Sequence, residues 1–167
     1  MAQPMHHPLV VLPADAEAYL ASLGIPVTAI YTALEHGELR AAEIDRFHPR
    51  GAAGLTRWIT VVGDLRRVMV TDHAWDQADH KNRPTCVRGD GAVTLSVVGG
   101  DSDTGNTESV RGPRAAHRRG AATAEALNDQ LELIEVAAII SSETVPLAGS
   151  PAPGGQWFLV YHRAEDG

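Results

Sequence analysis

Residues 55–73 constrain the fold more than any other stretch, because their apolar side chains recur at steps of three and four residues. This spacing is that of one face of an α-helix, and it predicts a helix from about Thr56 to His73. The apolar stripe consists of Leu55, Trp58, Ile59, Val62, Leu65 and Met69. The β-branched residues in "WITVV" also favour a strand, but the longer helical period outweighs them. We therefore expect this helix to belong to the core.

Two further segments have the length of strands and are rich in apolar residues. Residues 92–100, "AVTLSVVGG", are apolar nearly throughout and predict a strand that is buried on both faces. Residues 156–163, "QWFLVYHR", combine aromatic and β-branched residues and predict a C-terminal strand. A third apolar run within 131–142 predicts a strand that pairs antiparallel with the C-terminal one. The Pro- and Gly-rich residues 146–155 between them predict a connection too long for a tight hairpin.

The N-terminal part of the chain predicts two short helices. Asp15 is a suitable N-cap, and Gly24 a suitable left-handed stop, for a helix over Asp15–Leu23. A second helix is expected over Thr28–His36, closed by Gly37. Because the second helix contains no arginine, the pair does not match a helix-turn-helix that reads DNA. We expect a helical hairpin that packs on the rest of the domain.

The other segments predict connections and one more helix. Residues 47–54 and 72–91 are rich in turn-forming or polar residues and predict loops, and a fourth helix is expected to begin near Thr123. Together these elements predict an α+β fold, with a small, mostly antiparallel sheet of three or four strands, helices packed on one face and an N-terminal helical hairpin. Residues 14–167 then form a single domain, preceded by a flexible arm of residues 1–13.

Charge and composition restrict the partners of the chain. The formal net charge of −7 argues against nucleic acid or an anionic membrane as the partner of the whole surface. The basic residues are nevertheless concentrated, since 13 of the 14 lie between Arg40 and Arg119. Almost all of them are arginine, a bias typical of bacterial genomes that are rich in G and C. This bias alone is not evidence for phosphate contacts.

The sequence also bears on the compartment. No N-terminal segment has the pattern of a signal peptide, and none approaches the roughly 18 consecutive apolar residues of a membrane-spanning helix. The single Cys86 cannot form an internal disulfide. We therefore expect a cytoplasmic protein that does not associate with membranes.

Residues 99–123, "GGDSDTGNTESVRGPRAAHRRGAAT", are the main candidate for a functional site. Asp101 and Asp103 follow a predicted strand directly, where several metal-dependent enzymes place their carboxylates. Gly105 replaces the Thr or Val that dehalogenase-type phosphatases have at this position, and the spacing also misses one ligand and the glycine of a calcium loop. The alternative is a solvated loop whose Asp and Asn side chains cap their own turns.

The basic half of this segment has the composition of an anion site. Four arginines and one histidine lie within nine residues: Arg111, Arg114, His117, Arg118 and Arg119. They lead to the predicted helix start at Thr123, where free backbone N–H groups and the helix dipole favour negative charge. Arginine adds bidentate contacts to phosphate. No Walker A or G-x-G-x-x-G motif is present, so no particular nucleotide-binding fold is indicated.

Three functions are consistent with these features. The first is an accessory or binding domain that holds a small, phosphate-containing anion in the 101–123 loop and needs no cofactor. Its ligand-binding residues would be Asp101, Asp103, Thr104, Arg111, Arg114, His117, Arg118, Arg119 and Thr123. The second is a Mg²⁺-assisted phosphoester hydrolase, with Asp101 and Asp103 as metal ligands and His117 as general acid or base. The third is an assembly subunit that forms homo-oligomers through the edge of its C-terminal strands.

Two other groups of residues carry possible chemistry. One consists of two histidines and two aspartates: His73, Asp76, Asp79 and His80. If the preceding helix continued through them, His73 and His80 would share a face with Asp76 between them, and the interpretations are a divalent metal site or ordinary polar residues at the surface. The other is Cys86, which lies between Arg83 and Arg88, whose charges would lower the pKa of its thiol. No nucleophile motif surrounds it.

Overall fold

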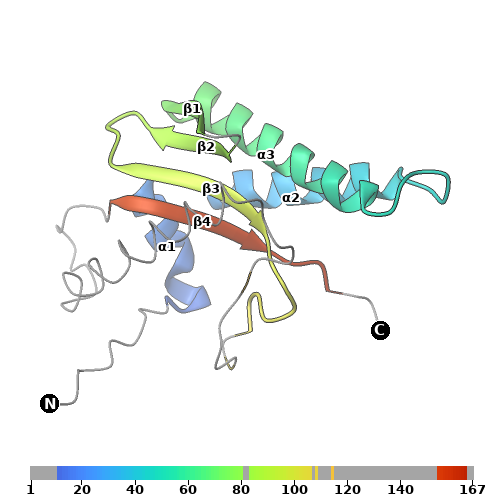
Figure 1. The fold of residues 1–167 in the computed structure, drawn as a ribbon. Coiled ribbons are helices and arrows are strands. Elements are labelled where there is room, and N and C mark those ends of the chain that lie inside the picture. The colour runs from blue at the N-terminus through green and yellow to red at the C-terminus, as the bar shows by residue number, and fades with distance from the viewer. Residues whose placement is uncertain (1–10, 81–82, 107, 109–113, 115–153, 165–167) are drawn as a thin grey trace, which may run out of the picture.

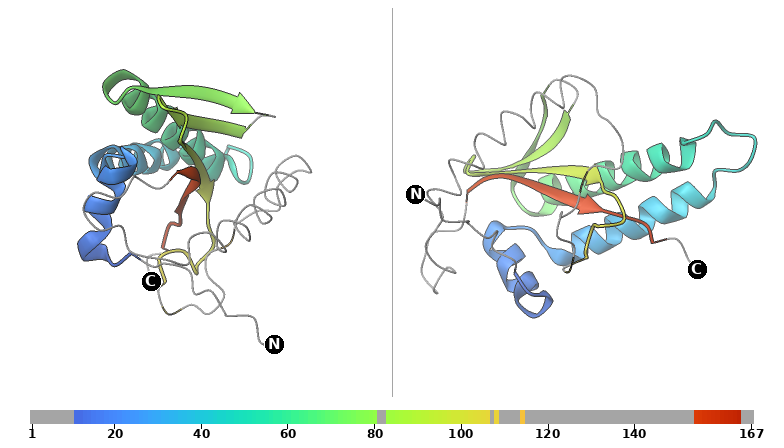
Figure 2. Two further views of the ribbon diagram at one scale, coloured as in Figure 1. Left: turned by 90° about the vertical axis from the view of Figure 1, so that its left-hand side faces the viewer. Right: turned by 60° about the horizontal axis from the view of Figure 1, so that its bottom comes forward.

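The computed structural model describes residues 11–80, 83–106, 108, 114 and 154–164. Within them, three helices precede a four-stranded sheet (Figure 1). The elements are α1 (Pro13–Leu23), α2 (Val27–Ala42), α3 (Ala52–Asp72), β1 (Trp75–His80), β2 (Arg83–Arg88), β3 (Val93–Gly99) and β4 (Gly155–Tyr161). In the strand order β1-β2-β3-β4, the first two pairings are antiparallel and β4 runs parallel to β3. The helices lie on one side of the sheet (Figure 2), so the predicted α+β fold is confirmed.

Helix α3 is the central element of the fold, as its apolar period predicts. Its residues Val61, Leu65 and Met69 are almost completely buried, and they pack in one cluster with the apolar side chains of β3. Trp58 adds a hydrogen bond from its indole Nε1 to the carbonyl oxygen of Val97 at 3.1 Å. Burial of this apolar face and the indole bond together hold the helix on the sheet.

The first turns of α3 extend beyond the sheet (Figure 1). The predicted stripe includes Leu55 and Ile59, but these side chains are 58% and 55% exposed, so their assignment to the core is wrong. A helical period identifies the apolar side of a helix, but it does not tell where the underlying sheet ends. Leu55 instead lines a cleft at that end of the sheet.

Helix α2 is longer than the sequence predicts, because Gly37 lies inside it rather than at its end. A Cβ at this position would lie only 2.6 Å from Cγ2 of Val61 and 3.2 Å from the carbonyl oxygen of Arg57. The glycine therefore serves the close approach of α2 to α3 and does not stop the helix. The predicted end at His36 is wrong for this reason, and α2 continues to Ala42.

Helix α1 confirms one predicted boundary and corrects the other. Gly24 ends the helix in the left-handed conformation, with a φ of 77°. Asp15, however, is not the N-cap, because the helix already begins at Pro13 and Asp15 lies in its first turn. Proline suits the first helical position because its fixed φ is helical and its missing N–H would have no helical partner. The carboxylate of Asp15 then complements the helix dipole.

Residues 72–91 do not form the predicted surface loop. They contain the end of α3 and the hairpin of β1 and β2, in which His80 pairs with Arg83 across a two-residue connection. The sequence conceals this hairpin because β1 is an edge strand in which Trp75 is buried, whereas residues 76–79 are exposed and, except for Ala78, polar. The connection also lacks the Asn-Gly or Asp-Gly signal of a tight hairpin.

The strands predicted at 92–100 and 156–163 are confirmed as β3 and β4, and these two strands pair with each other. β4 lies beside β3 in parallel, from Val93 opposite Gly155 to Gly99 opposite Tyr161. The strand predicted within 131–142, its antiparallel pairing and the helix start at Thr123 lie outside the described residues, as does most of the N-terminal arm.

Arg66 holds the β1–β2 hairpin on α3, and its loss should weaken the fold. Its Nη2 atom donates to the carbonyl oxygens of Ala78 and Thr85 and to a carboxylate oxygen of Asp79, the last at 2.9 Å. Because Arg66→Ala removes several charge-assisted bonds from a mostly buried site, we expect a loss of about 2–3 kcal/mol in the free energy of unfolding, measured in urea. Arg67→Ala is the control, since Arg67 is exposed and its ion pair with Asp64 lies within its own helix, and should cost less than about 1 kcal/mol. Equal losses in the two variants would contradict this role.

The contact between α2 and α3 can be tested with two matched glycine substitutions. Gly37→Ala places a Cβ against Val61 and should destabilise the protein by about 1–3 kcal/mol, because neither helix can move without disturbing the core. Gly63→Ala, in the middle of α3, meets no described atom within 4 Å and should instead stabilise the protein by up to about 1 kcal/mol. Thermal unfolding followed by circular dichroism distinguishes them. A Gly37→Ala variant as stable as Gly63→Ala would show that the helices do not pack this closely.

Candidate functional site

A cleft lies where the parallel strands β3 and β4 end. Because the two strands are parallel, the chain leaves both of them at the same edge of the sheet, and the N–H of Gly100 donates to the carbonyl oxygen of Tyr161 at 2.7 Å. The first turns of α3 extend past this edge and form another wall of the cleft, which has a volume of about 510 Å³. This size falls in the range of about 300–1,000 Å³ that small-molecule sites occupy. The carboxyl ends of parallel strands are also where α/β proteins bind their ligands.

A second hollow of about 380 Å³ continues the cleft toward α2. The two hollows share Arg57, Tyr161, His162 and Arg163, so they adjoin each other, and we refer to them together as the groove. Glu38 of α2 lines only the second hollow. The groove is therefore formed by α2, α3 and the ends of β3 and β4, which come from distant parts of the sequence.

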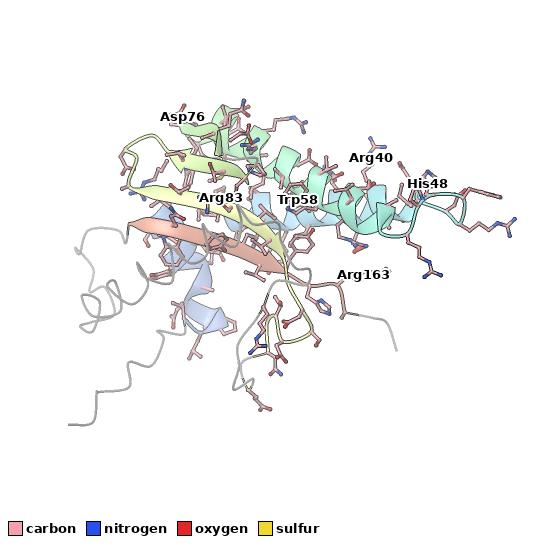
Figure 3. All side chains as sticks on the ribbon, viewed as in Figure 1. Arg40, His48, Trp58, Asp76, Arg83 and Arg163 are labelled. Carbon is pink, nitrogen blue, oxygen red and sulfur yellow. The ribbon has the colours of Figure 1, made fainter. Side chains whose placement is uncertain are left out.

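One part of the groove contains two arginines that share a single carboxylate. Arg57 donates from Nε and Nη2 to the two carboxylate oxygens of Glu38, at 2.7 and 3.1 Å. Nε of Arg163 lies 3.5 Å from Oε1 of the same carboxylate, and the side chain of Arg163 is 63% exposed. Figure 3 shows Arg163 just beyond the end of β4. Two guanidinium groups and one carboxylate leave a net positive charge at this place.

His162 adds a ring nitrogen of defined character beside these arginines. Its Nδ1 lies 3.2 Å from the carbonyl oxygen of Gly100. Because a carbonyl oxygen can only accept a hydrogen bond, this contact assigns the ring hydrogen to Nδ1. Nε2 is then an acceptor in the neutral ring and a donor in the protonated one. The side chain is exposed and lines both hollows.

The other part of the groove is apolar and is lined in part by glycine backbone. Leu55 and the indole of Trp58 line it together with four glycines, Gly51, Gly54, Gly99 and Gly100. The hydrogen bond from Trp58 to β3 fixes the position of the indole. The groove therefore has a cationic end and an apolar end.

The acidic half of the predicted 101–123 site begins directly after Gly100. One carboxylate oxygen of Asp101 accepts the backbone N–H groups of Asp103 and Arg114, at 3.2 and 3.1 Å. The N–H of Asp101 also donates to the carbonyl oxygen of Arg114 at 2.9 Å. Asp101 thus caps its own turn, as the solvated-loop interpretation of this half predicts. Oγ1 of Thr104 is buried and has no hydrogen-bond partner among the described residues.

The structure describes four of the nine predicted ligand-binding residues: Asp101, Asp103, Thr104 and Arg114. None of the four is among the residues that line the groove, although Asp101 follows the lining residue Gly100. The other five, Arg111, His117, Arg118, Arg119 and Thr123, lie outside the described residues. Their part in binding stays a prediction.

The histidines and aspartates of residues 73–80 do not lie on one helical face. His73 is the residue after α3, whereas Asp76, Asp79 and His80 belong to β1. Neighbouring residues of a strand point to opposite faces, and Asp79 pairs with Arg66. In the part of the chain that the structure describes, no three His, Cys, Asp or Glu side chains gather as a metal site.

The prediction that nearby arginines lower the pKa of Cys86 is wrong. Cys86 is buried in the core cluster, and this burial raises the pKa of its thiol to about 11, because the thiolate loses its hydration. The charge of Arg66 acts in the opposite direction but is the smaller effect. Arg88 is engaged elsewhere, since it binds Asp90 and the carbonyl oxygen of Leu23. Cys86 therefore belongs to the core and not to a nucleophilic site.

Sequence reasoning missed the residues that give the groove its charge. The helical pattern places Arg57 outside the apolar stripe but gives it no function. Glu38 was not assigned to a helix, because it lies beyond the predicted end at His36. The signal that was present is "YHR" at the end of the C-terminal strand, where two polar side chains follow an apolar run.

Comparisons of the chain with protein-family models, with curated proteins and with solved structures gave no significant match. The function is therefore argued from the groove itself. Within the described residues, no helix has the length and hydropathy required to cross a membrane.

The buried state of Cys86 predicts slow reaction with thiol reagents. A shift of the thiol pKa from 9.0 to about 11 lowers the thiolate fraction at pH 8 by about 100-fold, and burial also blocks access. We expect the folded protein to react with a chromogenic disulfide reagent at least about 100-fold more slowly than the protein in urea. Since Cys86 is the single cysteine, the signal is unambiguous. Equal rates in the two states would contradict the burial of this thiol.

Proposed function

We propose that the protein is a binding domain for a small anionic molecule, with a phosphate group as the preferred anion, and that the ligand lies in the groove at the ends of β3 and β4. The observation that carries this proposal is the pair of arginines, Arg57 and Arg163, that share the carboxylate of Glu38 in a groove of ligand size. A bound anion would neutralise the positive charge that remains when two guanidinium groups share one carboxylate.

The two arginines are suited to different parts of this task. Arg57 is mostly buried and is fixed by two hydrogen bonds to Glu38, so its position is set before a ligand arrives. Arg163 is exposed and its contact with Glu38 is longer, so its guanidinium can turn toward an incoming anion at little cost. The protonated ring of His162 would add one more donor from Nε2.

The predicted role of the basic run in residues 111–119 is compatible with this location. Arg114 is tied through its backbone to Asp101, the residue that follows Gly100 in the groove. This tie supports the proposal that arginines of the run lie within reach of the same ligand. Asp101, in contrast, uses a carboxylate oxygen for its own turn, which does not favour the Mg²⁺-assisted hydrolase. Self-association through the C-terminal strands stays a prediction that no observation favours.

Anion binding can be measured by isothermal titration with inorganic phosphate, pyrophosphate and methyl phosphate at low ionic strength. We expect saturable binding of at least one of them to the wild-type protein. Arg163→Ala should weaken this binding by about tenfold or more, because a charge-assisted hydrogen bond is worth about 1.5–3 kcal/mol. The exposed position of Arg163 makes loss of the fold an unimportant risk in this variant.

Arg67→Ala is the matched control, because it changes the net charge equally, and Arg67 is exposed but does not line the groove. With the titration repeated at 0.1 M salt, it should leave the affinity within about twofold, since charges separated by more than a Debye length of about 10 Å are then largely screened. If no anion binds saturably, or if the two variants weaken binding equally, the proposed site is wrong.

Removal of the carboxylate that the two arginines share should act in the opposite direction. Glu38→Gln leaves both guanidinium groups without their counter-charge, so the affinity for phosphate should rise by about three- to tenfold in the same titration. A lower affinity would contradict the idea that Glu38 and the ligand compete for the arginines, and would instead give Glu38 a direct part in binding.

A further inference from the structure

We propose that the ligand of this groove is a planar aromatic molecule with its anionic group at one end, such as an aryl phosphate or a nucleoside monophosphate. This inference rests on the proposed function and adds the chemical class of the part of the ligand that carries the anionic group. Its basis is two glycines at the apolar end, Gly54 and Gly99, that neither the backbone conformation nor the packing of the protein requires.

Most glycines near the helices have an evident structural reason. Gly24 and Gly51 adopt positive φ angles, of 77° and 86°, which side chains disfavour. Gly37 and Gly100 have close neighbours, since an added Cβ would approach Val61 and Thr104 far too closely. At these four positions, the backbone conformation or the packing of the fold itself disfavours a side chain.

Gly54 and Gly99 differ from those positions in both respects. Neither of them has a positive φ, and a Cβ added at either one meets no described atom within 4 Å. Gly54 also lies in the first turn of α3, where alanine would favour the helix by up to about 1 kcal/mol. Gly63 shares both properties but does not line the groove, whereas Gly54 and Gly99 do. A Cβ here would therefore occupy space in the groove rather than space needed by the protein.

Backbone that carries no side chain and lines a groove favours a flat ligand. Without side chains, the peptide groups of two separate elements, the start of α3 and the end of β3, can be approached to van der Waals distance by a ring. The indole of Trp58, which is held in place by its bond to Val97, gives the same end of the groove an aromatic surface. Arg57 lines both hollows, so the ring would lie next to the cationic end.

The test compares two probes that have the same anionic group and differ in the ring: methyl phosphate and 1-naphthyl phosphate. We expect 1-naphthyl phosphate to bind at least about tenfold more tightly to the wild-type protein, because it buries its rings in the apolar end. It should also change the fluorescence of Trp58, and Trp58→Phe should remove that change while Trp75 and Trp157 remain.

Gly54→Ala should abolish most of this tenfold preference and leave the affinity for methyl phosphate within about twofold. Gly63→Ala is the matched control: it is the same substitution in the same helix, it also meets no described atom within 4 Å, and it does not line the groove. Both affinities should be unchanged in this control. Gly99→Ala is a second test of the groove and should act like Gly54→Ala. Thermal unfolding shows whether each variant is folded.

The outcomes separate this inference from the proposed function. If methyl phosphate binds and 1-naphthyl phosphate binds no more tightly, the inference is wrong and the anion site stands. If Gly54→Ala and Gly99→Ala keep the full preference, the ring does not lie against these glycines and the inference is also wrong. If neither probe binds, the proposed function itself fails. Adenosine 5′-monophosphate, as a third probe, supports a nucleotide when it binds more tightly than 1-naphthyl phosphate and a simpler aromatic anion when it binds less tightly.

Discussion

The packing of α3 against both the sheet and α2 is the constraint on which the rest of this structure depends. Val61, Leu65 and Met69 lie almost completely buried in the core, and Val61 occupies the space that Gly37 leaves open on α2. With α3 fixed in this way, its first turns extend past the ends of β3 and β4 (Figure 1). The groove exists because the helix continues where the sheet has ended, so the packing that stabilises the core also creates the candidate site.

The charges of the groove follow from the same arrangement. The close approach of α2 and α3 brings Glu38 and Arg57 together in a two-bond ion pair, and the chain that leaves β4 brings Arg163 to the same carboxylate. Arg66 and Arg88, in contrast, bind backbone carbonyl oxygens in addition to a carboxylate and hold elements of the fold together. Among the arginines that the structure describes, the pair at Glu38 combines incomplete charge compensation with a cavity.

The features that were predictable from the sequence are those with a strong local pattern. The period of residues 55–73 identifies α3, and the apolar runs at 92–100 and 156–163 identify β3 and β4. The β1–β2 hairpin was missed because an exposed edge strand has the composition of a loop. The extension of α2 was missed because Gly37 is explained by its contact with Val61 on another helix, which the local sequence does not reveal. The groove combines Glu38, Arg57, Gly99 and Arg163, which no local pattern links. For residues 101–104 the sequence allowed both a ligand site and a self-capped turn, and Asp101 forms the turn.

The central claim, that an anion binds between Arg57 and Arg163, is tested most directly by NMR of the arginine Nε–Hε groups during titration with phosphate. We expect the signals of Arg57 and Arg163 to shift together and to saturate at one common affinity, while those of the exposed Arg46 and Arg50 in the α2–α3 connection move little. Shifts of similar size on all exposed arginines, growing with ionic strength and without saturation, would contradict it.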